Sequence, residues 1–167
     1  LKEIKLPELM TEKTLRLEKQ YKLSPQLARE IVDDTLFETY VARFKHIEPN
    51  FLAHVLLEVP KEIKTRFKLD PKVLKETDYA FVLEQHNNNV ISKSAILEIL
   101  VELAQGKKVD INRYKIISED TLAAEIQQLV AVQKDATINV LMGMLMAKYR
   151  GKVDGQTVMK LLQKYKT

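Results

Sequence analysis

The fold is decided by the stretch ATINVLMGMLMAKYRGKVDGQTVMKLLQKY, which covers residues 136–165. Its first half is apolar almost throughout and ends at Gly151, a residue type that commonly closes helices. Asp154 then stands at the N-cap position of a second helix. That helix repeats apolar residues at the i, i+3, i+4, i+7 spacing of one face: Val158, Leu161, Leu162 and Tyr165. The stretch predicts a hairpin of two helices, the first running from Ala136 to Arg150.

Upstream, prolines and cap residues predict a series of further helices. Ser24-Pro25 and Asp70-Pro71 each place a cap residue before a proline, which is favoured at the first helical position. Other predicted helix starts are Pro7, Thr35, Pro49, Thr77, Ser92 and Ser118. Pro60 should kink or restart the helix that contains it. With four Gly, five Pro and no sustained period-two alternation, the chain is predicted to be all-α.

The 167 residues divide into two predicted domains. Residues 1–106 form a helical connecting domain, whose last helix is apolar on more than one face and is closed by Gly106. Residues 107–117 are polar and short, so we expect a linker with about one helical turn. Residues 118–167 then form a small basic tail domain, a bundle of three amphipathic helices.

The uncharged run LMGMLM at residues 141–146 has two interpretations. One is a flexible groove lined by methionines. The favoured one is the buried central helix of the tail bundle. Because Gly in a helix interior costs about 1 kcal/mol relative to Ala, we expect a neighbouring helix to cross closely at Gly143.

The excess positive charge lies at the end of the chain. Residues 134–167 hold seven Lys or Arg and two Asp, a net charge of +5, whereas the whole chain has +4. Such an asymmetry is typical of a surface that meets a polyanion, although it also fits a merely soluble basic surface.

The cations gather around the turn of the hairpin. Lys148, Arg150 and Lys152 surround a helix C-terminus, where the helix dipole alone favours positive charge. The dipole does not explain Lys160 and Lys164, which lie on the next helix. We further expect two glycines to leave the turn open to a sugar–phosphate backbone: Gly151 and Gly155.

Signs of catalysis or of membrane insertion are few. His54 and Glu58 lie four residues apart on one helix and could bind a metal, but a surface ion pair is the favoured interpretation. No nucleotide-binding or hydrolase motif occurs, and no apolar run reaches the ~18 residues that a membrane span needs. The absence of cysteine excludes disulfides and fits a reducing cytoplasm. Because the first residue is Leu1, we expect the C-terminal part of a longer protein.

The segment LMGMLMAKYRGKVDGQTVMKLL, residues 141–162, resembles the end of the archaeal, E-type subunit of glutamyl-tRNA(Gln) amidotransferase. It is more distantly similar to the tail of the bacterial, B-type subunit and to YqeY-like proteins. Upstream segments follow the order of the same family: EPNFLA at 48–53, VISKSAI at 90–96 and SEDTL at 118–122. The stretches 132–137 and 107–117 depart from the family pattern.

This resemblance implies the following roles. The whole enzyme converts glutamate misacylated on tRNA(Gln) to glutamine, with ammonia from a partner amidase and with ATP and Mg²⁺ at an N-terminal part that is not in this chain. The tail binds the outer corner of the tRNA. The positions that match the motif here are Lys148, Arg150, Gly151, Lys152 and Gly155. Charge placement adds Lys160 and Lys164.

We therefore expect a tRNA-binding region of a glutamyl-tRNA(Gln) amidotransferase, with no cofactor and no chemistry of its own. It would hold the tRNA by shape and phosphate contacts. Two alternatives remain open. One is a helical adaptor with a basic end and no RNA role, and the other is an enzyme that uses the face of His54 and Glu58.

Overall fold

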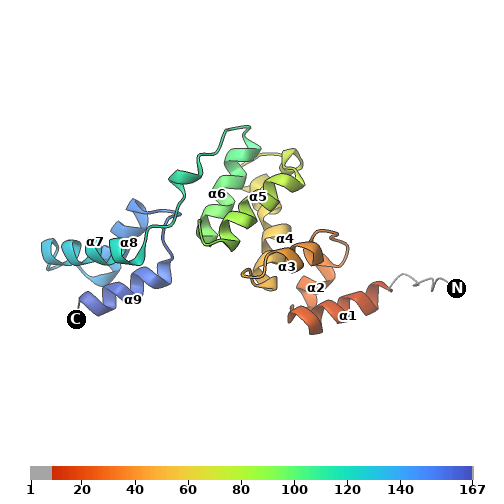
Figure 1. Ribbon diagram of the computed structural model, residues 1–167, viewed down its shortest axis with the longest axis horizontal. Coiled ribbons are helices and arrows are strands. Elements are labelled where there is room, and N and C mark those ends of the chain that lie inside the picture. Colours follow the sequence, from red (N-terminus) through yellow and green to blue (C-terminus); the bar gives the residue numbers. More distant parts are fainter. Residues whose placement is uncertain (1–8, 167) are drawn as a thin grey trace. The chain divides into compact units, whose positions relative to one another are not determined.

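A computed structural model describes residues 9–166, and its regular elements are α-helices and short 3₁₀ turns (Figure 1). The all-α prediction is confirmed. Between residues 9 and 166, strand-type pairing is limited to an isolated antiparallel bridge of Ile91 with Lys115. Every helix in this range is too short or too polar to cross a bilayer. The helix start predicted at Pro7 lies outside the described residues.

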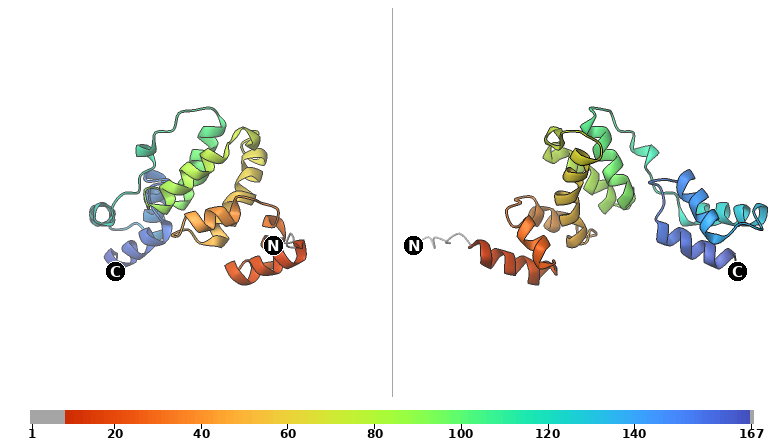
Figure 2. Two further views of the ribbon diagram at one scale, coloured as in Figure 1. Left: turned by 45° about the vertical axis from the view of Figure 1, so that its right-hand side comes forward. Right: turned by 180° about the vertical axis from the view of Figure 1, so that it is seen from behind.

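The chain divides into two compact units, one ending at Val73 and the other beginning at Leu74. The first unit contains α1 (Met10–Tyr21), α2 (Pro25–Ile31), α3 (Phe37–Arg43), α4 (Pro49–Thr65) and the 3₁₀ turn η1 (Pro71–Val73). Helix α1 packs on α2, and both α2 and α3 pack on α4 (Figure 2). The largest fully buried side chains of this unit include Phe37, Tyr40 and Phe44.

Local signals account for most helix boundaries of this unit. The Ser24 hydroxyl accepts a hydrogen bond from Leu27 N at 3.2 Å, as expected for an N-cap. Helix α3 begins at Phe37 because Asp34 Oδ1 accepts from Phe37 N at 3.0 Å, so the predicted start at Thr35 is too early.

Two proline predictions for this unit hold only in part. Helix α4 continues through Pro60 to Thr65 without a restart, because packing of its buried face outweighs the one lost backbone bond. Asp70 begins only a 3₁₀ turn, in which its Oδ1 accepts from Lys72 N at 3.0 Å. The chain has no room for a full helix there before Glu76 begins the next one.

The second unit contains α5 (Glu76–Asn87), α6 (Lys93–Ala104), the 3₁₀ turn η2 (Ile111–Arg113), α7 (Glu119–Val132), α8 (Ile138–Lys148) and α9 (Gly155–Tyr165). Helix α5 packs on α6, while α7 and α8 both pack on α9 (Figures 1 and 2). The cap of α5 is not Thr77 as predicted. Asp78 Oδ2 accepts from Lys75 N at 2.7 Å, which places the start of the helix earlier.

The segment 107–117 contacts the rest of the second unit along its length. It contains the expected helical turn, η2, and the side chain of Tyr114 is buried. Ile116 N donates to Val90 O at 2.9 Å, which joins the segment to the chain just before α6. The segment lies inside the second compact unit. The domain boundary that the sequence places at residues 107–117 stays a prediction.

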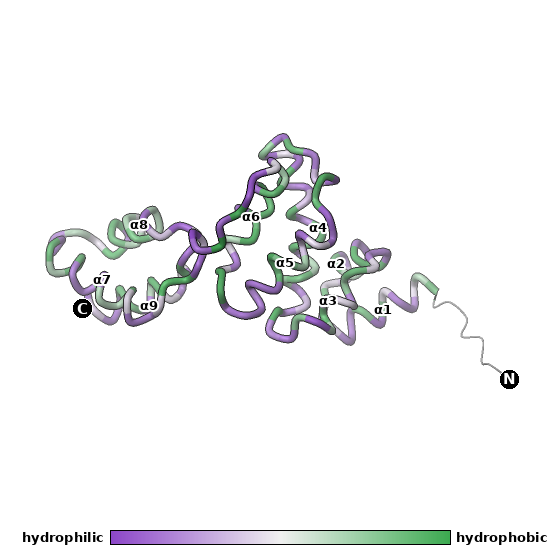
Figure 3. The backbone as a smooth tube through the Cα atoms, turned by 45° about the horizontal axis from the view of Figure 1, so that its top comes forward, coloured by the Kyte–Doolittle hydropathy of each residue, from purple (hydrophilic) through white to green (hydrophobic). Residues whose placement is uncertain are grey.

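Helices α7 to α9 form the expected three-helix bundle. Their buried residues make one cluster: Leu122, Ile126, Leu141, Leu145, Val153, Val158, Leu161 and Leu162. The Lys166 ammonium donates to the carbonyls of Lys134 and Ala136, which ties the end of α9 to the α7–α8 link. Hydrophobic and hydrophilic residues alternate along α9 (Figure 3), as expected when a helix buries one face.

Helix α8 differs from its predicted role. Its fully buried residues are Leu141 and Leu145, while the opposite face is exposed. A Cβ built on Gly143 would find nothing within 4 Å among the described atoms, so the predicted close helix crossing is wrong. In a bundle of three helices, each helix has only two neighbours, and an apolar helix therefore keeps one uncovered side.

Candidate nucleic-acid interface

The link between α8 and α9 is a turn with a defined geometry. Lys152 N donates to Tyr149 O at 2.9 Å and closes the turn. Gly151 has φ +75°, the left-handed conformation that glycine adopts without steric cost. Asp154 Oδ2 then accepts from Thr157 N at 3.3 Å and begins α9, as the sequence predicts.

Gly151 packs against α6 and is buried. Its carbonyl accepts a hydrogen bond from the buried Ser92 hydroxyl at 2.7 Å. A Cβ at this glycine would lie 3.6 Å from Glu98 Oε2 and 3.9 Å from both Ala95 Cβ and Tyr114 Cδ1. Gly151 therefore does not leave the main chain open to a phosphate backbone, and this expectation is wrong. Its carbonyl is bonded to Ser92, and a side chain at this position would point toward Ala95 and Glu98 of α6.

Gly155 is the first residue of α9 and is half-buried. A Cβ there would lie 3.5 Å from Met142 Cε and 4.0 Å from Met146 Cε, which are ordinary packing distances. Since its φ is not positive, the conformation does not require glycine at this position.

Lys148 is held by a carboxylate of α7. Its Nζ lies 2.8 Å from Glu125 Oε2 and 5.1 Å from the centre of the Tyr149 ring. The hydrogen bond with Glu125 raises the pKa of Lys148, and the same hydrogen bond lowers the pKa of Glu125. The lysine side chain nevertheless stays 60% exposed, so its ammonium keeps N–H groups for a further acceptor.

Arg150 is held in the same way by a carboxylate of α6. Its Nε donates to Glu98 Oε1 at 3.0 Å, and the side chain is 74% exposed. The guanidinium therefore uses one N–H toward the protein and keeps its two terminal nitrogens for an outside acceptor. A carboxylate beside each cation also lowers the local excess of positive charge that the sequence suggests.

The remaining predicted cations divide between the turn and α9. Lys152 is half-buried in the turn, and its carbonyl accepts from Ile117 N at 3.2 Å. Lys160 and Lys164 lie one helical turn apart on the exposed side of α9, and the Lys164 ammonium lies 5.3 Å from the centre of the Tyr165 ring. Lys148 thus ends α8 and pairs with α7, Arg150 pairs with α6 from the turn, and Lys152 follows in the turn, with two further lysines on α9.

Three residues that shape this surface were missed from the sequence. Glu125 and Glu98 orient the two main cations, and Ser92 fixes the turn. Ser92 does occupy the predicted N-cap of α6, but its hydroxyl bonds to the turn instead of capping its own helix. These partners lie 23, 52 and 59 residues away along the chain, so no local pattern indicates them.

A hollow of about 670 Å³ lies beside the turn. Its lining includes Ser94 on α6, Glu119 on α7, and Gly155 with Thr157 on α9. His86 also lines it, with Nδ1 3.0 Å from Ile91 O. Two hydroxyls of the hollow are used within the fold: Thr157 Oγ1 donates to Asp154 Oδ2 at 3.3 Å, and Ser94 Oγ lies 2.9 Å from Ser92 Oγ.

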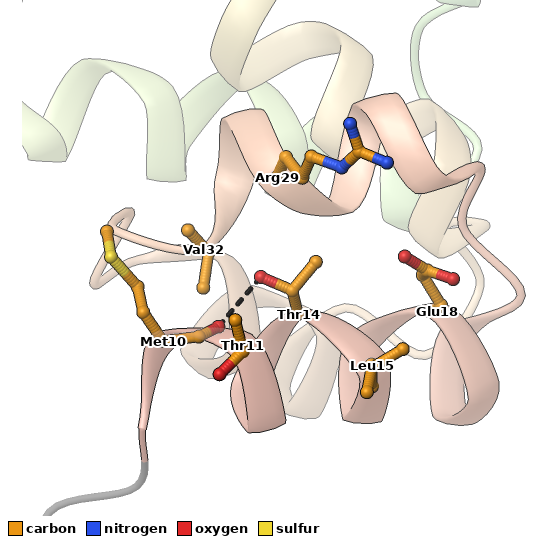
Figure 4. A pocket seen from close by; sticks show the side chains of 7 residues that line it. All are labelled: Met10, Thr11, Thr14, Leu15, Glu18, Arg29 and Val32. Atoms are coloured by element: carbon orange, nitrogen blue, oxygen red, sulfur yellow. Dashed lines mark hydrogen bonds between the residues drawn. The ribbon is translucent and has the colours of Figure 1, made fainter.

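A second hollow, of about 470 Å³, lies between α1 and α2 in the first unit (Figure 4). Met10 and Leu15 expose apolar surface there, and Glu18 and Arg29 are its charged lining residues. Thr14 uses its hydroxyl to donate to Met10 O at 2.8 Å. This lining is suited to an apolar contact rather than to catalysis.

His54 and Glu58 could bind a metal by their spacing, although an ion pair is the interpretation that the sequence favours. Glu58 Oε1 lies 2.8 Å from Lys61 Nζ, in an ion pair on the same helix. In the described part of the chain, no three His, Cys, Asp or Glu side chains come together as possible metal ligands.

In comparisons with known proteins, the profile of the GatB domain (GatB_Yqey) matches residues 35–165. The chain belongs to the GatB domain family. The matched range covers α3 to α9 and includes the whole basic turn. No solved structure matches the chain.

Relatives of this GatB domain chain include archaeal proteins named as the E-type subunit of glutamyl-tRNA(Gln) amidotransferase. The protein of Thermococcus sibiricus is 33% identical over 175 residues, that of Methanocaldococcus jannaschii is 32% identical over 179, and that of Methanococcus maripaludis strain S2 is 30% identical over 176. Each alignment covers 95% of this chain, which spans only 27–28% of the length of these relatives.

Proposed function

We propose that this chain is a tRNA-binding part of a cytoplasmic glutamyl-tRNA(Gln) amidotransferase and holds tRNA(Gln) by shape and phosphate contacts. Its support is the GatB domain match together with the names of the relatives. The single observation that carries the RNA role is the turn after α8, where Lys148 and Arg150 are ordered and yet mostly exposed.

The ion pairs prepare these cations for binding. A long side chain loses rotamer freedom when it contacts a ligand, and this loss opposes association. Glu125 and Glu98 already fix Lys148 and Arg150, so part of that loss occurs on folding. The free N–H groups can then donate to phosphate oxygens, which fixes the orientation of an RNA without reading its bases. Lys160 and Lys164 extend the positive surface along α9.

The rest of the reaction belongs to other parts of such an enzyme. In this proposal a partner amidase supplies ammonia, and ATP and Mg²⁺ are used outside this chain. The described residues do not fit a metal centre, since no three possible ligands meet, and no metal-dependent step is assigned to them. The role of the chain is positioning: it holds the body of the tRNA so that the acceptor end reaches the reacting groups.

The proposal is tested by replacing Lys148, Arg150 and Lys152 together with Ala and measuring tRNA(Gln) binding over a series of salt concentrations. Each lost phosphate contact should lower the log–log salt slope by about 0.7–0.9, so we expect a slope smaller by about 2–3 and an affinity lower by at least about tenfold at low salt. Comparison with another tRNA and with duplex DNA then measures selectivity.

A matched control removes the same charge elsewhere. Lys45, Lys64 and Lys72 are exposed residues of the first unit, and their replacement by Ala lowers the net charge equally. This variant should keep its affinity within about twofold, because none of these lysines belongs to the proposed phosphate-binding surface. Equal binding by wild type and the Lys148/Arg150/Lys152 variant would contradict the proposal.

A second candidate function is docking to another protein. It is favoured by exposed apolar side chains at and just before α1. Leu9, Met10 and Leu15 are all more than half exposed. An apolar contact of this kind should depend weakly on salt, whereas phosphate binding weakens steeply. A chain that shows no RNA retention at low salt would favour this second candidate.

A further inference from the structure

The exposed side of α8 carries an uncharged surface that the bundle does not cover. We call it the α8 outer face and define it by Val140, Gly143, Met144 and Ala147. These positions follow the i, i+3, i+4, i+7 spacing of one helical face, opposite to the buried Leu141 and Leu145. Val140 is 53% exposed and Met144 is 43% exposed.

Gly143 lies in the interior of α8, where glycine weakens a helix relative to alanine. Its backbone is not left-handed, so the conformation does not require glycine. Nor does packing require it, because a Cβ would meet no described atom within 4 Å. Neither fold nor packing within the described chain accounts for this residue. A molecule that approaches the helix backbone from outside would account for it, because only glycine leaves the main chain uncovered.

The charges at the end of this face indicate what that molecule is. Lys148 is the last residue of α8 and Arg150 lies in the turn just beyond it, so two exposed cations follow the uncharged surface along the chain. A matching ligand is anionic at one side and apolar at the other. Nucleic acid has this combination, since charged phosphates alternate with sugar rings and base faces that accept apolar contacts.

We propose that the α8 outer face is the surface on which sugar and base groups of the bound RNA lie, with Gly143 at the point of closest approach. This inference rests on the proposed function, and it adds a contact surface that carries no charge. The cations of the turn bind the neighbouring phosphates, while Val140 and Met144 contact the apolar groups between them. A partner protein helix on the same face is the competing occupant, and binding titrations of variants separate the two.

The experiment uses the whole chain with Gly143→Leu, Gly143→Ala and Met144→Gln, each titrated with tRNA(Gln) at several salt concentrations. Gly143→Leu should weaken binding by about tenfold, the effect of a residue at a closely packed interface centre. The salt slope should stay unchanged, because no phosphate contact is removed. Met144→Gln should weaken binding by a few-fold without adding bulk. Ala124→Leu, a small-to-large change at an exposed position on α7, is the control and should bind like wild type.

The melting temperature is a second measurement: filling the position of Gly143 should weaken tRNA binding but should not weaken the fold. Gly143→Ala should raise the melting temperature by about 2–4 °C, because alanine favours the helix and the space around Gly143 is open. A lower melting temperature would show that the glycine serves the fold and would overturn the inference.

The binding measurements distinguish failure of this inference from failure of the proposed function. If Gly143→Leu and Met144→Gln bind tRNA like wild type while the Lys148/Arg150/Lys152 variant does not, the α8 outer face is not an RNA surface, although the proposed function stands. If wild type binds no RNA at all, both proposals fail. If wild type self-associates in sedimentation experiments and Gly143→Leu does not, a second copy covers this face, and the inference is also overturned.

Discussion

At the scale of single residues, the turn after α8 depends on one backbone conformation and one buried hydroxyl. Gly151 is left-handed, and its carbonyl is fixed by Ser92 at 2.7 Å. An unpaired buried carbonyl costs free energy, so this hydrogen bond favours a single arrangement of the turn. The neighbouring cations Lys148, Arg150 and Lys152 are attached to this arrangement, and its rigidity determines where they project.

We predict that the two glycines of this turn respond differently to alanine. Gly151→Ala should lower the free energy of unfolding by about 1–2 kcal/mol, because an L-residue is strained at φ +75°. Gly155→Ala should be neutral or stabilise the chain by up to about 0.5 kcal/mol, since its Cβ only touches Met142 and Met146 at ordinary distances. Urea denaturation of both variants measures the difference, and equal losses would contradict this account.

A helix cap can be predicted from the sequence when its hydrogen-bond partner lies nearby in the chain, but not when the partner lies far away. Ser118 and Asp154 cap their helices through bonds to N–H groups three residues away, so a pattern of neighbours is enough. Thr137 caps α8 in the same way, although the sequence predicts that this helix begins at Ala136. Ser92 matches the same pattern, but a carbonyl 59 residues away takes its hydroxyl. For the same reason the sequence correctly indicates which cations gather at the turn and cannot indicate that Gly151 is buried beneath them.

At the scale of helices, amphipathic patterning predicts α9 well and α8 poorly. α9 has a clear polar side with Lys160 and Lys164, so its orientation follows from the sequence. α8 is apolar on nearly every side, and periodicity therefore cannot say which side faces the core. Only the number of neighbouring helices decides this, which leaves Gly143 and Met144 outside.

The carboxylates on α6 and α7 order the turn cations but also compete with an RNA for them, and at low salt we expect the competition to be the larger effect. Glu98→Gln and Glu125→Gln should each strengthen tRNA binding at low salt, because they remove a negative charge beside Arg150 and Lys148. Exposed ion pairs are weak, so we expect gains of only about 1.5- to 5-fold per variant.

Binding titrations at two salt concentrations measure these gains, with Glu48→Gln, an exposed position of the first unit, as the control. Weaker binding by the Glu98 and Glu125 variants would mean that ordering of Lys148 and Arg150 by their partners matters more than their freed charge.

A third prediction concerns the attachment of α1 to α3. Arg16 Nη1 lies 2.6 Å from Glu38 Oε1, and this hydrogen bond lowers the pKa of Glu38 below its ordinary value of 4.5. A carboxylate with a lowered pKa stabilises the folded state above its ordinary pKa, and this stability is lost as the pH falls through the lowered value.

The loss should be no more than about 0.5–1 kcal/mol, because both side chains are about a third exposed and water screens the pair. Glu38→Gln should therefore lower stability at pH 7 and flatten its decrease between about pH 5 and pH 3. Thermal unfolding across this range checks the effect, with Glu12→Gln on α1 as the control. An unchanged pH profile would contradict a role for this pair.

At the scale of the whole molecule, the division near Val73 and the sequence-based division at 107–117 give different fragments. The bundle of α7 to α9 has its own buried cluster. Yet the turn that presents the cations is fixed by contacts to Ser92, Glu98 and Tyr114, which all precede residue 118. A fragment of about 50 residues is also near the lower size limit at which a single core is stable.

We therefore predict that residues 74–167 alone fold and bind tRNA within about threefold of the whole chain, whereas residues 118–167 bind at least about tenfold more weakly. The shorter fragment keeps every predicted cation, but it loses the hydroxyl of Ser92 that fixes the Gly151 carbonyl and the Tyr114 ring that packs beside this glycine. Circular dichroism establishes helical folding of each fragment, and titration with tRNA measures affinity. If both fragments fold and bind tRNA equally, the cations alone define the interface. The contacts of α6 with the turn would then not be needed for binding.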